Sequence, residues 1–226
     1  MKKITETERI KKNYEEYKSN PTVAKNHTYT EYINQVTKER QNLYKQIILS
    51  KFKKSEELEL LEVGAGSGSN LASFKNLGLL DKNIYANELL EDRVKDLKTN
   101  SPNVNILPGD ALQLSYENKF DIVFQSTVFT SILNADFKKQ FANKLWNMTK
   151  QNGIILWYDF IYDNPKNKSV KGINKSEIKL LFKDSTKIEF YKVTLAPPIG
   201  RKFQKLYTLL NSFPFLRTHV IAVIHK

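Results

Sequence analysis

The stretch LLEVGAGSGSN, residues 60–70, places an apolar run directly before three glycines at alternate positions. Glycine loses more conformational entropy on folding than any other residue, so three of them within five residues indicate a turn that requires them. Such a turn between a strand and a helix is typical of sites where the backbone approaches a ligand closely. In the dinucleotide-binding fingerprint the third glycine would fall at Ser69, so this turn differs from that fingerprint.

The rest of the chain alternates strand and helix patterns around this turn. Strands are predicted at 57–63, 83–88, 104–110, 120–126 and 154–159, and helices at 69–77, 90–98 and from Phe137 to Gly153. The alternation predicts a parallel sheet that is covered by helices on both faces. The tail departs from it: a capping-box spacing from Asn174 to Glu177 opens a helix at 176–182, and strands follow at 187–195 and 218–225.

The first 56 residues read as helical. Ile10, Tyr14 and Tyr17 recur at helical spacing before a break at 19–22, and Thr30 is a candidate N-cap for a helix over 31–53. We expect residues 1–56 to form a helical extension that caps the site, and residues 57–226 to form the main domain. A rim insertion is predicted at 196–217 within that domain. The whole chain, with 226 residues, is long enough for one well-filled α/β domain.

Composition narrows the chemistry. The absence of cysteine excludes disulfides, thiolate zinc sites, iron–sulfur clusters and cysteine nucleophiles. No stretch approaches the ~20 apolar residues of a membrane span, and the lysine-rich start lacks a signal-peptide core, so we expect a cytoplasmic protein. The net charge of +12 is carried by the two flanks rather than by residues 58–160. Either base composition or an anionic partner, such as a phosphorylated sugar, nucleic acid or membrane surface, explains this charge.

Acidic residues mark the ends of the first three strands. Glu62 stands two residues before Gly64, Glu88 closes the second strand, and Asp110 closes the third. Together with the glycine turn and the strand FDIVFQS, these residues resemble the class I S-adenosylmethionine-dependent methyltransferases. The resemblance implies a three-layer sandwich around a Rossmann-like, seven-stranded, mostly parallel sheet. Its seventh strand would run antiparallel between the fifth and sixth, where the doubly apolar VIAVI (220–224) belongs.

The resemblance also implies the ligands of S-adenosylmethionine and of its product S-adenosylhomocysteine. Glu62 and the turn would face the methionine part and the ribose, Glu88 the ribose hydroxyls, and Asp110 the adenine edge. The full set of implied cofactor residues is Glu62, Gly64, Ala65, Gly66, Ser67, Gly68, Asn87, Glu88, Leu89, Asp110, Ala111, Gln125 and Ser126. Glu62 can also be read as an ordinary helix-dipole partner. Arg40, which interrupts an apolar stripe, either reaches the cofactor carboxylate or extends to solvent.

The later motifs QSTVFTSIL (125–133), GIILWYDFIYDNP (153–165), VTLAPPIGR (193–201) and LRTHVIAVI (216–224) resemble a group of bacterial methyltransferases often associated with surface-polysaccharide gene clusters. On the acceptor side we expect Tyr158, Asp159 and His219 to act in catalysis. The general base is His219 or Asp159, and a pair of the two would suit both orientation and proton removal. His219 as a hydrogen-bonded structural residue and Asp159 as a loop cap remain the alternatives. The segment around His27 and Tyr29 would close the other side.

Three functions follow from this reading. The first is O-methylation of a small-molecule or glycan acceptor, which the basic flanks suggest is anionic. The second is RNA methylation, favoured by the charge and by N-terminal tyrosines, although no RNA-binding module is recognisable. The third is a catalytically silent relative that retains cofactor binding. The spacing of His, Asp and Glu predicts no metal site, and the oligomeric state stays open.

Overall fold

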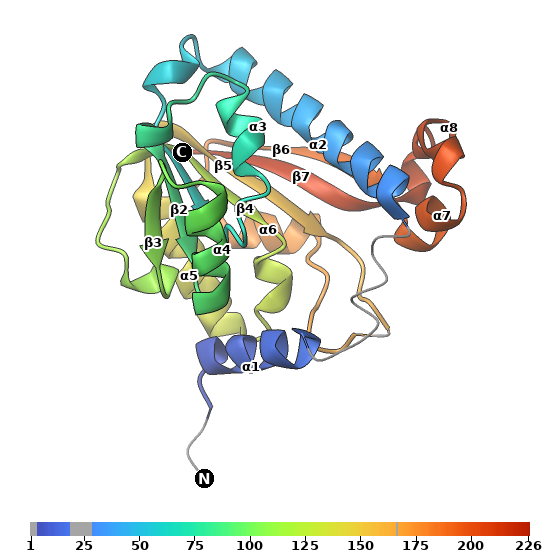
Figure 1. Cartoon of the computed structure of the whole chain (residues 1–226), viewed down its shortest axis with the longest axis horizontal. Helices are drawn as coiled ribbons and strands as arrows, with labels where there is room; N and C mark the ends of the chain where they lie inside the picture. The colour runs from blue at the N-terminus through green and yellow to red at the C-terminus, as the bar shows by residue number, and fades with distance from the viewer. Residues whose placement is uncertain (1–3, 19–28, 166) are drawn as a thin grey trace.

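The computed structural model describes residues 4–18, 29–165 and 167–226 and contains one seven-stranded sheet (Figure 1). The strands are β1 (Leu60–Val63), β2 (Ile84–Glu88), β3 (Asn105–Pro108), β4 (Phe120–Ser126), β5 (Thr149–Phe160), β6 (Lys187–Leu195) and β7 (Arg217–His225). Their order in the sheet is β3-β2-β1-β4-β5-β7-β6, and β7 runs antiparallel to both of its neighbours. The predicted Rossmann-like sheet with an antiparallel seventh strand is therefore confirmed.

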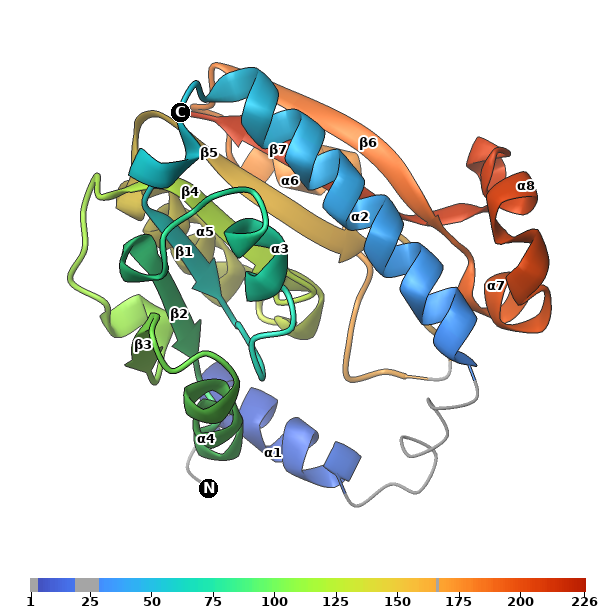
Figure 2. The same ribbon diagram turned by 45° about the horizontal axis from the view of Figure 1, so that its top comes forward.

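Helices cover both faces and complete three layers (Figure 2). They are α1 (Glu6–Lys18), α2 (Thr30–Lys51), α3 (Leu71–Lys75), α4 (Glu91–Asn100), α5 (Ala135–Met148), α6 (Lys175–Leu181), α7 (Pro197–Lys202) and α8 (Tyr207–Asn211). One buried cluster joins α2, α3 and α4 to the sheet, and a second joins α5 and α6 to the opposite face. Tyr44, Phe74 and Phe124 pack edge-on or stacked at the centre of the first cluster.

Some predicted boundaries were wrong. The helix expected to end at Gly153 ends at Met148, and β5 begins at Thr149. Gly153 lies inside the strand, next to Ile154, which pairs with Ile122 of β4. A Cβ at Gly153 would come within 2.9 Å of the Asp121 carbonyl oxygen, which favours glycine there. Thr30 is the first residue of α2 rather than its cap, which is Tyr29 without a side-chain hydrogen bond. Asn174 does cap α6, because its side chain accepts a hydrogen bond from the Glu177 backbone.

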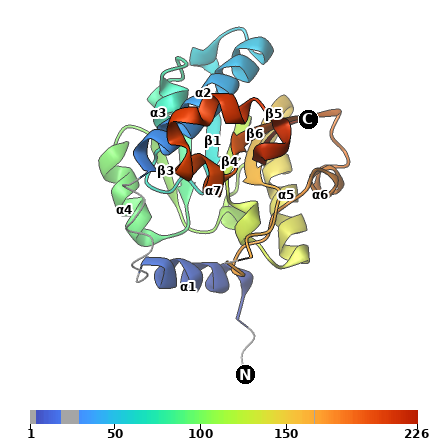
Figure 3. The same cartoon turned by 90° about the vertical axis from the view of Figure 1, so that its right-hand side faces the viewer.

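Two segments lie at the carboxyl ends of the parallel strands (Figure 3). Helix α1 crosses this edge, separated in sequence from α2 by residues 19–29. The rim, residues 196–217, carries α7 and α8 between β6 and β7. The predicted break at 19–22 and His27 lie outside the described residues. Within the part of the chain that the structure describes, every helix is too short or too polar to cross a membrane.

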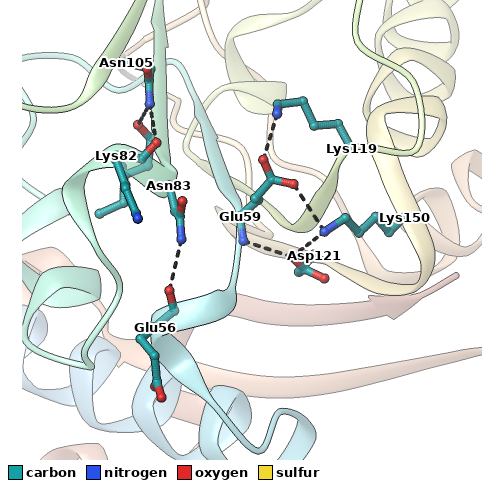
Figure 4. A network of polar contacts seen from close by, with 9 residues as sticks. Glu56, Glu59, Lys82, Asn83, Asn105, Lys119, Asp121 and Lys150 are labelled. Carbon is teal, nitrogen blue, oxygen red and sulfur yellow. Dashed lines mark hydrogen bonds and ion pairs between the residues drawn. The ribbon is translucent and has the colours of Figure 1, made fainter.

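The opposite, amino-terminal edge of the sheet is closed by an ionic cluster (Figure 4). Glu59, just before β1, accepts hydrogen bonds or ion pairs from Lys119 at 2.7 Å and from Lys150 at 3.2 Å. Lys150 also pairs with Asp121 at 2.9 Å, and the Asp121 carboxylate accepts the backbone N–H of Glu59. The charged groups of this cluster are therefore all paired within the chain.

Candidate active site

The glycine turn after β1 uses each glycine for a physical reason. Gly64, Gly66 and Gly68 have φ values of +72°, +59° and +88°, which side chains other than glycine rarely adopt. A Cβ at Gly64 would lie 2.5 Å from the Val128 side chain, and one at Gly68 would lie 2.8 Å from Leu97. A Cβ at Gly66 would meet nothing within 4 Å. The turn therefore presents open backbone at its centre while its two ends are packed.

Two side chains at the end of β2 hold the neighbouring loops in place. The buried Glu88 accepts the backbone N–H of Gly66 at 2.7 Å and that of Leu90 at 2.9 Å, one on each carboxylate oxygen. Asn87 donates to the carbonyls of Leu107 and Gly109. The loops after β1, β2 and β3 are thus tied together at one edge. Each Glu88 oxygen keeps a second lone pair for a further donor.

A cavity, called here the first cavity, opens directly beyond these loops. The predicted cofactor residues that line it are Gly64, Asn87, Glu88, Leu89, Asp110, Ala111 and Ser126. Glu62, Ala65, Gly66, Ser67, Gly68 and Gln125 are not among its lining residues. Gln125 lies beneath the cavity floor, fully buried, where it donates to Asp159 and accepts from the Val128 backbone.

Glu62 of β1 and Arg40 of α2 each hold one buried polar atom that has no hydrogen-bond partner among the described residues. One Glu62 oxygen accepts from Asn70 at 2.7 Å, but its Oε2 has no hydrogen-bond partner among the described residues. The Nε of Arg40 is also buried without a hydrogen-bond partner among the described residues, while its Nη1 lies 3.5 Å from the Ser126 hydroxyl. Burial raises the pKa of Glu62 to about 8, although Asn70 and Arg40 oppose the rise. Buried polar atoms are normally paired, so these two point to a missing ligand.

Helix α1 contributes lining residues that the sequence did not reveal. Thr7, Ile10 and Tyr14 face the first cavity. Thr7 donates to Asp110 at 3.0 Å, and the Arg93 guanidinium lies 4.4 Å from the centre of the Tyr14 ring. In the sequence, Ile10 and Tyr14 form part of a stripe at helical spacing. That stripe is the one signal that could have predicted their contact with a cavity.

The first turn of α1 is also fixed to the loop that precedes α5. Glu6 accepts the backbone N–H groups of Leu133 at 2.6 Å and Asn134 at 3.2 Å, and Arg9 donates to both Glu6 and the Ser131 carbonyl. Together with the bond of the adjacent Thr7 to Asp110, these contacts tie the first turn of the helix to the loops that follow β3 and β4. It covers the first cavity from outside.

Asp159, predicted as catalytic, lies at the end of β5 and is fully buried. Its carboxylate accepts from the Thr130 hydroxyl at 2.6 Å and from Gln125 Nε2 at 3.1 Å. Burial raises the pKa of Asp159 to about 7, against the lowering effect of these hydrogen bonds. The group therefore titrates near neutral pH inside the protein.

The expected pair of His219 with Asp159 is not formed. Their backbones are neighbours, since Asp159 lies opposite Val220 and Phe160 opposite His219. Successive side chains of a strand point to opposite faces, however, and His219 stacks on Tyr158 at 5.2 Å, on the face away from Asp159. Burial and the charge of Arg40 lower the pKa of His219 to about 4, so it is a weak base.

Tyr158 shares this face, and its ring lies beneath Arg40. The guanidinium carbon of Arg40 is 4.6 Å from the ring centre, and the Tyr158 hydroxyl is 3.0 Å from the Thr194 hydroxyl. Burial raises the pKa of Tyr158 to about 12. Neither Tyr158 nor His219 lines the first cavity in the described part of the chain. Tyr158 therefore contacts Arg40, and His219 packs against the ring of Tyr158.

A second cavity adjoins the first, and the two share Arg93, Thr127, Ser131 and the α1 residues Ile10 and Tyr14. Its other lining residues are Asn13, Thr130, Phe160, Ser169 and Val170. Thr127 has a φ of +58°, which is an outlier for a β-branched residue. Backbone strain of this kind is concentrated at functional sites, and here it lies where the two cavities meet.

Comparison with known proteins agrees with this geometry. Residues 61–157 match the family model described as a methyltransferase domain. This segment, somewhat under half of the chain, is similar to methyltransferase domains. Its cofactor is S-adenosylmethionine. No curated protein sequence matches the chain significantly.

Solved structures show the same fold. A SAM-dependent methyltransferase from Archaeoglobus fulgidus superposes with a TM-score of 0.59 at 14% identity, covering 82% of this chain and 94% of that one. The YcgJ protein from Bacillus subtilis gives 0.56 at 14% identity, with coverages of 82% and 97%. The [4+2]-cyclase SpnF gives 0.58 at 12% identity, with coverages of 82% and 80%. At such identities the likeness shows the fold alone.

Proposed function

We propose that this chain transfers a methyl group from S-adenosylmethionine to a hydroxyl of a small-molecule or carbohydrate acceptor. The observation that carries the proposal is the pair of buried atoms without partners, Glu62 Oε2 and Arg40 Nε, beside an open glycine turn. When bound, the cofactor would supply a methyl group on a sulfonium: the acceptor oxygen would form the O–C bond in line as the C–S bond breaks, with S-adenosylhomocysteine as leaving group and the hydroxyl proton released to water.

The chain's own residues fit this cofactor. Its amino-acid part is a zwitterion, and Glu62 offers an acceptor for an ammonium while Arg40 offers a donor for a carboxylate. Glu88 has lone pairs for ribose hydroxyls, and the open side of Gly66 admits a ligand close to the backbone. Asp110 and Ala111 line the part of the first cavity beside α1, which suits an adenine edge.

The second cavity supports the acceptor class. Its polar lining of Asn13, Thr127, Thr130 and Ser169 offers donors and acceptors for sugar hydroxyls, while Phe160 offers an apolar surface. Arg93 gives it one cation, which favours an anionic acceptor such as a phosphorylated sugar. A glycan precursor of a surface polysaccharide, made in the cytoplasm, would have this chemistry.

Asp159 is a positioning residue in this proposal. Its carboxylate holds the Thr130 hydroxyl, and Thr130 lines the second cavity. When Asp159 is charged, the Thr130 hydroxyl donates its hydrogen to Asp159. The lone pairs of the Thr130 oxygen then remain to accept a hydrogen bond from the hydroxyl of the acceptor. We assign His219 and Tyr158 to the support of Arg40 instead of proton transfer, because His219 is a weak base on the other face of the sheet.

The test is transfer of labelled methyl groups from S-adenosylmethionine to three pools: nucleotide sugars with sugar phosphates, glycan extracts, and RNA. We expect label in a carbohydrate pool and binding of S-adenosylhomocysteine by calorimetry. Label in RNA alone would favour the RNA alternative, which rests on the net charge of +12.

A catalytically silent relative is the remaining alternative. The fold by itself does not decide it, since SpnF, a chain of this fold, is described as a [4+2]-cyclase. Product binding without transfer to any pool would favour that reading. Absence of S-adenosylhomocysteine binding would overturn the proposal as a whole.

A further inference from the structure

The rim, residues 196–217, exposes an apolar surface although it is firmly anchored. Its exposed large side chains are Phe203, Leu206, Leu209, Phe213 and Phe215, with Leu209 61% and Phe215 74% exposed. Leu206 directly precedes α8, Leu209 lies within it, and Phe213 follows its end by two residues. A concentration of this kind marks a surface that contacts another body.

Two polar side chains of α8, Tyr207 and Asn211, already have a hydrogen-bond partner within the chain. Glu39 of α2 accepts hydrogen bonds from the Tyr207 hydroxyl at 2.6 Å, from Asn211 at 2.7 Å and from the Thr194 backbone at 3.1 Å. Gly200 packs so closely on Tyr32 that a Cβ there would overlap the ring. The contacts with α2 therefore hold the rim in place. Its exposed apolar side chains are not covered by any other element of the described residues.

Charge identifies what this surface fits. Residues 190–226 contain no aspartate or glutamate, and Arg201, Lys202 and Lys205 flank the exposed apolar side chains. Glu39, the acid that the rim contacts, is already bonded inward. Against a second copy of this chain, a two-fold interface would bring the same cations together, which costs free energy. An anionic bilayer surface complements both the cations and the apolar side chains.

We propose that the rim is a docking surface for anionic lipid membranes. Phe203, Leu206, Leu209, Phe213 and Phe215 enter the boundary between headgroups and acyl chains, and Arg201, Lys202 and Lys205 contact the headgroup phosphates. Because the rim joins β6 to β7 at the carboxyl ends of the parallel strands, docking holds this edge of the sheet toward the bilayer (Figure 3). The proposal does not depend on which acceptor is methylated.

The test is co-sedimentation of the full chain with vesicles of phosphatidylcholine alone or with about one third phosphatidylglycerol. We expect binding to the mixed vesicles, weak binding to the neutral ones, and loss of binding at high salt. Leu209→Ser with Phe215→Ser should lower the partition coefficient at least tenfold. Lys202→Glu with Lys205→Glu should lower it similarly, and only for the anionic vesicles.

The matched control is Leu49→Ser with Leu180→Ser, which removes two leucines that are 50% and 69% exposed on α2 and α6, outside the rim. This variant should bind like the wild type. Equal binding by the rim and control variants would overturn the proposal, as would wild-type protein that stays in the supernatant. If analytical ultracentrifugation shows that the wild type is a dimer and that the rim substitutions make it a monomer, the surface binds a second copy of the chain instead. Circular dichroism confirms that each variant is folded.

Discussion

Glu59 and Glu62 stand three residues apart at β1, yet their surroundings are opposite. Glu59 belongs to the amino-terminal edge, where Lys119 and Lys150 pair with it. Burial would raise the pKa of Glu59, but the hydrogen bonds of the two lysines lower it below its usual value. Glu62 is fully buried, keeps one oxygen without a partner, and has its pKa raised to about 8.

The difference separates a structural carboxylate from a binding one. At the amino-terminal edge the chain satisfies its own charges, so the cluster stabilises the folded state. At the carboxyl-terminal edge the chain holds buried polar atoms that only a ligand can satisfy, so the folded apoprotein is destabilised there. Sites of this kind trade stability for function. The predictions below test this contrast, starting with the largest expected effect.

Replacement of Glu62 by glutamine should have the largest effect. We expect affinity for S-adenosylhomocysteine, measured by calorimetry, to fall about 100-fold, because an acceptor of charged hydrogen bonds is removed. The same variant should make the apoprotein more stable at pH 8 by about 1–2 kcal/mol, since its neutral amide need not ionise while buried. Thermal unfolding at several pH values measures this gain.

The pH dependence follows from the sign of the shift. The pKa of Glu62 is higher in the folded than in the unfolded state, so the folded state binds more protons between about pH 4.5 and about 8. Stability of the wild type therefore falls as pH rises through this range, and the advantage of Glu62→Gln grows. Glu59→Gln is the matched control. It should cost about 1 kcal/mol, discounted because the cluster is partly exposed, and leave affinity unchanged.

Arg40→Met should separate the two parts of the ligand. We expect affinity for S-adenosylhomocysteine to fall about 10- to 100-fold, the range for a charge-assisted hydrogen bond. Affinity for 5′-methylthioadenosine, which lacks the amino acid, should stay the same. Arg93→Met is the control, because Arg93 lines the cavity beside Tyr14 and α1 and should affect both ligands alike. A parallel loss for both ligands in Arg40→Met would show that Arg40 only supports the fold.

Much of the scaffold was predictable because local chemistry decided it. Apolar runs marked the strands, and the glycines at 64, 66 and 68 are required by their positive φ values. VIAVI, which is apolar on both faces, predicted a strand inside the sheet, and the resemblance implied its place; β7 is indeed buried between β5 and β6. These features depend on short stretches whose residues act together.

What the sequence did not reveal depends on contacts between distant segments. The register of β7 against β5 decides that His219 and Asp159 point to opposite faces, and a shift of one residue would have reversed that outcome. The docking of α1 rests on single contacts such as Thr7 with Asp110, 103 residues apart in sequence. The end of α5 was misplaced because Gly153 reads as a helix stop, whereas tertiary packing against Asp121 places it in a strand.

Asp159→Asn tests the positioning role with a smaller expected effect. We expect turnover to fall about tenfold while affinity for S-adenosylhomocysteine is unchanged, since Asp159 acts through Thr130 on the acceptor side. Because burial raises the pKa of Asp159 to about 7, wild-type turnover should rise with pH through neutrality, as the carboxylate form increases. The variant should lose that rise. Thr130→Val should reproduce the loss of turnover, and a pH profile that is unchanged in Asp159→Asn would remove Asp159 from the reaction.

The smallest effect is expected at the helix that covers the first cavity. Thr7→Val keeps the shape of the side chain but removes its hydrogen bond to Asp110, which should be worth about 1 kcal/mol, or roughly fivefold in affinity. If α1 encloses the ligand, the loss appears mainly as faster release of S-adenosylhomocysteine in stopped-flow measurements, together with faster amide hydrogen exchange in α1. Thr99→Val on α4, where the hydroxyl bonds only its own helix, is the control and should change neither rate. Faster hydrogen exchange without faster release would mean that α1 covers the cavity without retaining the ligand, which would leave Glu62 and Arg40 as the groups that hold it.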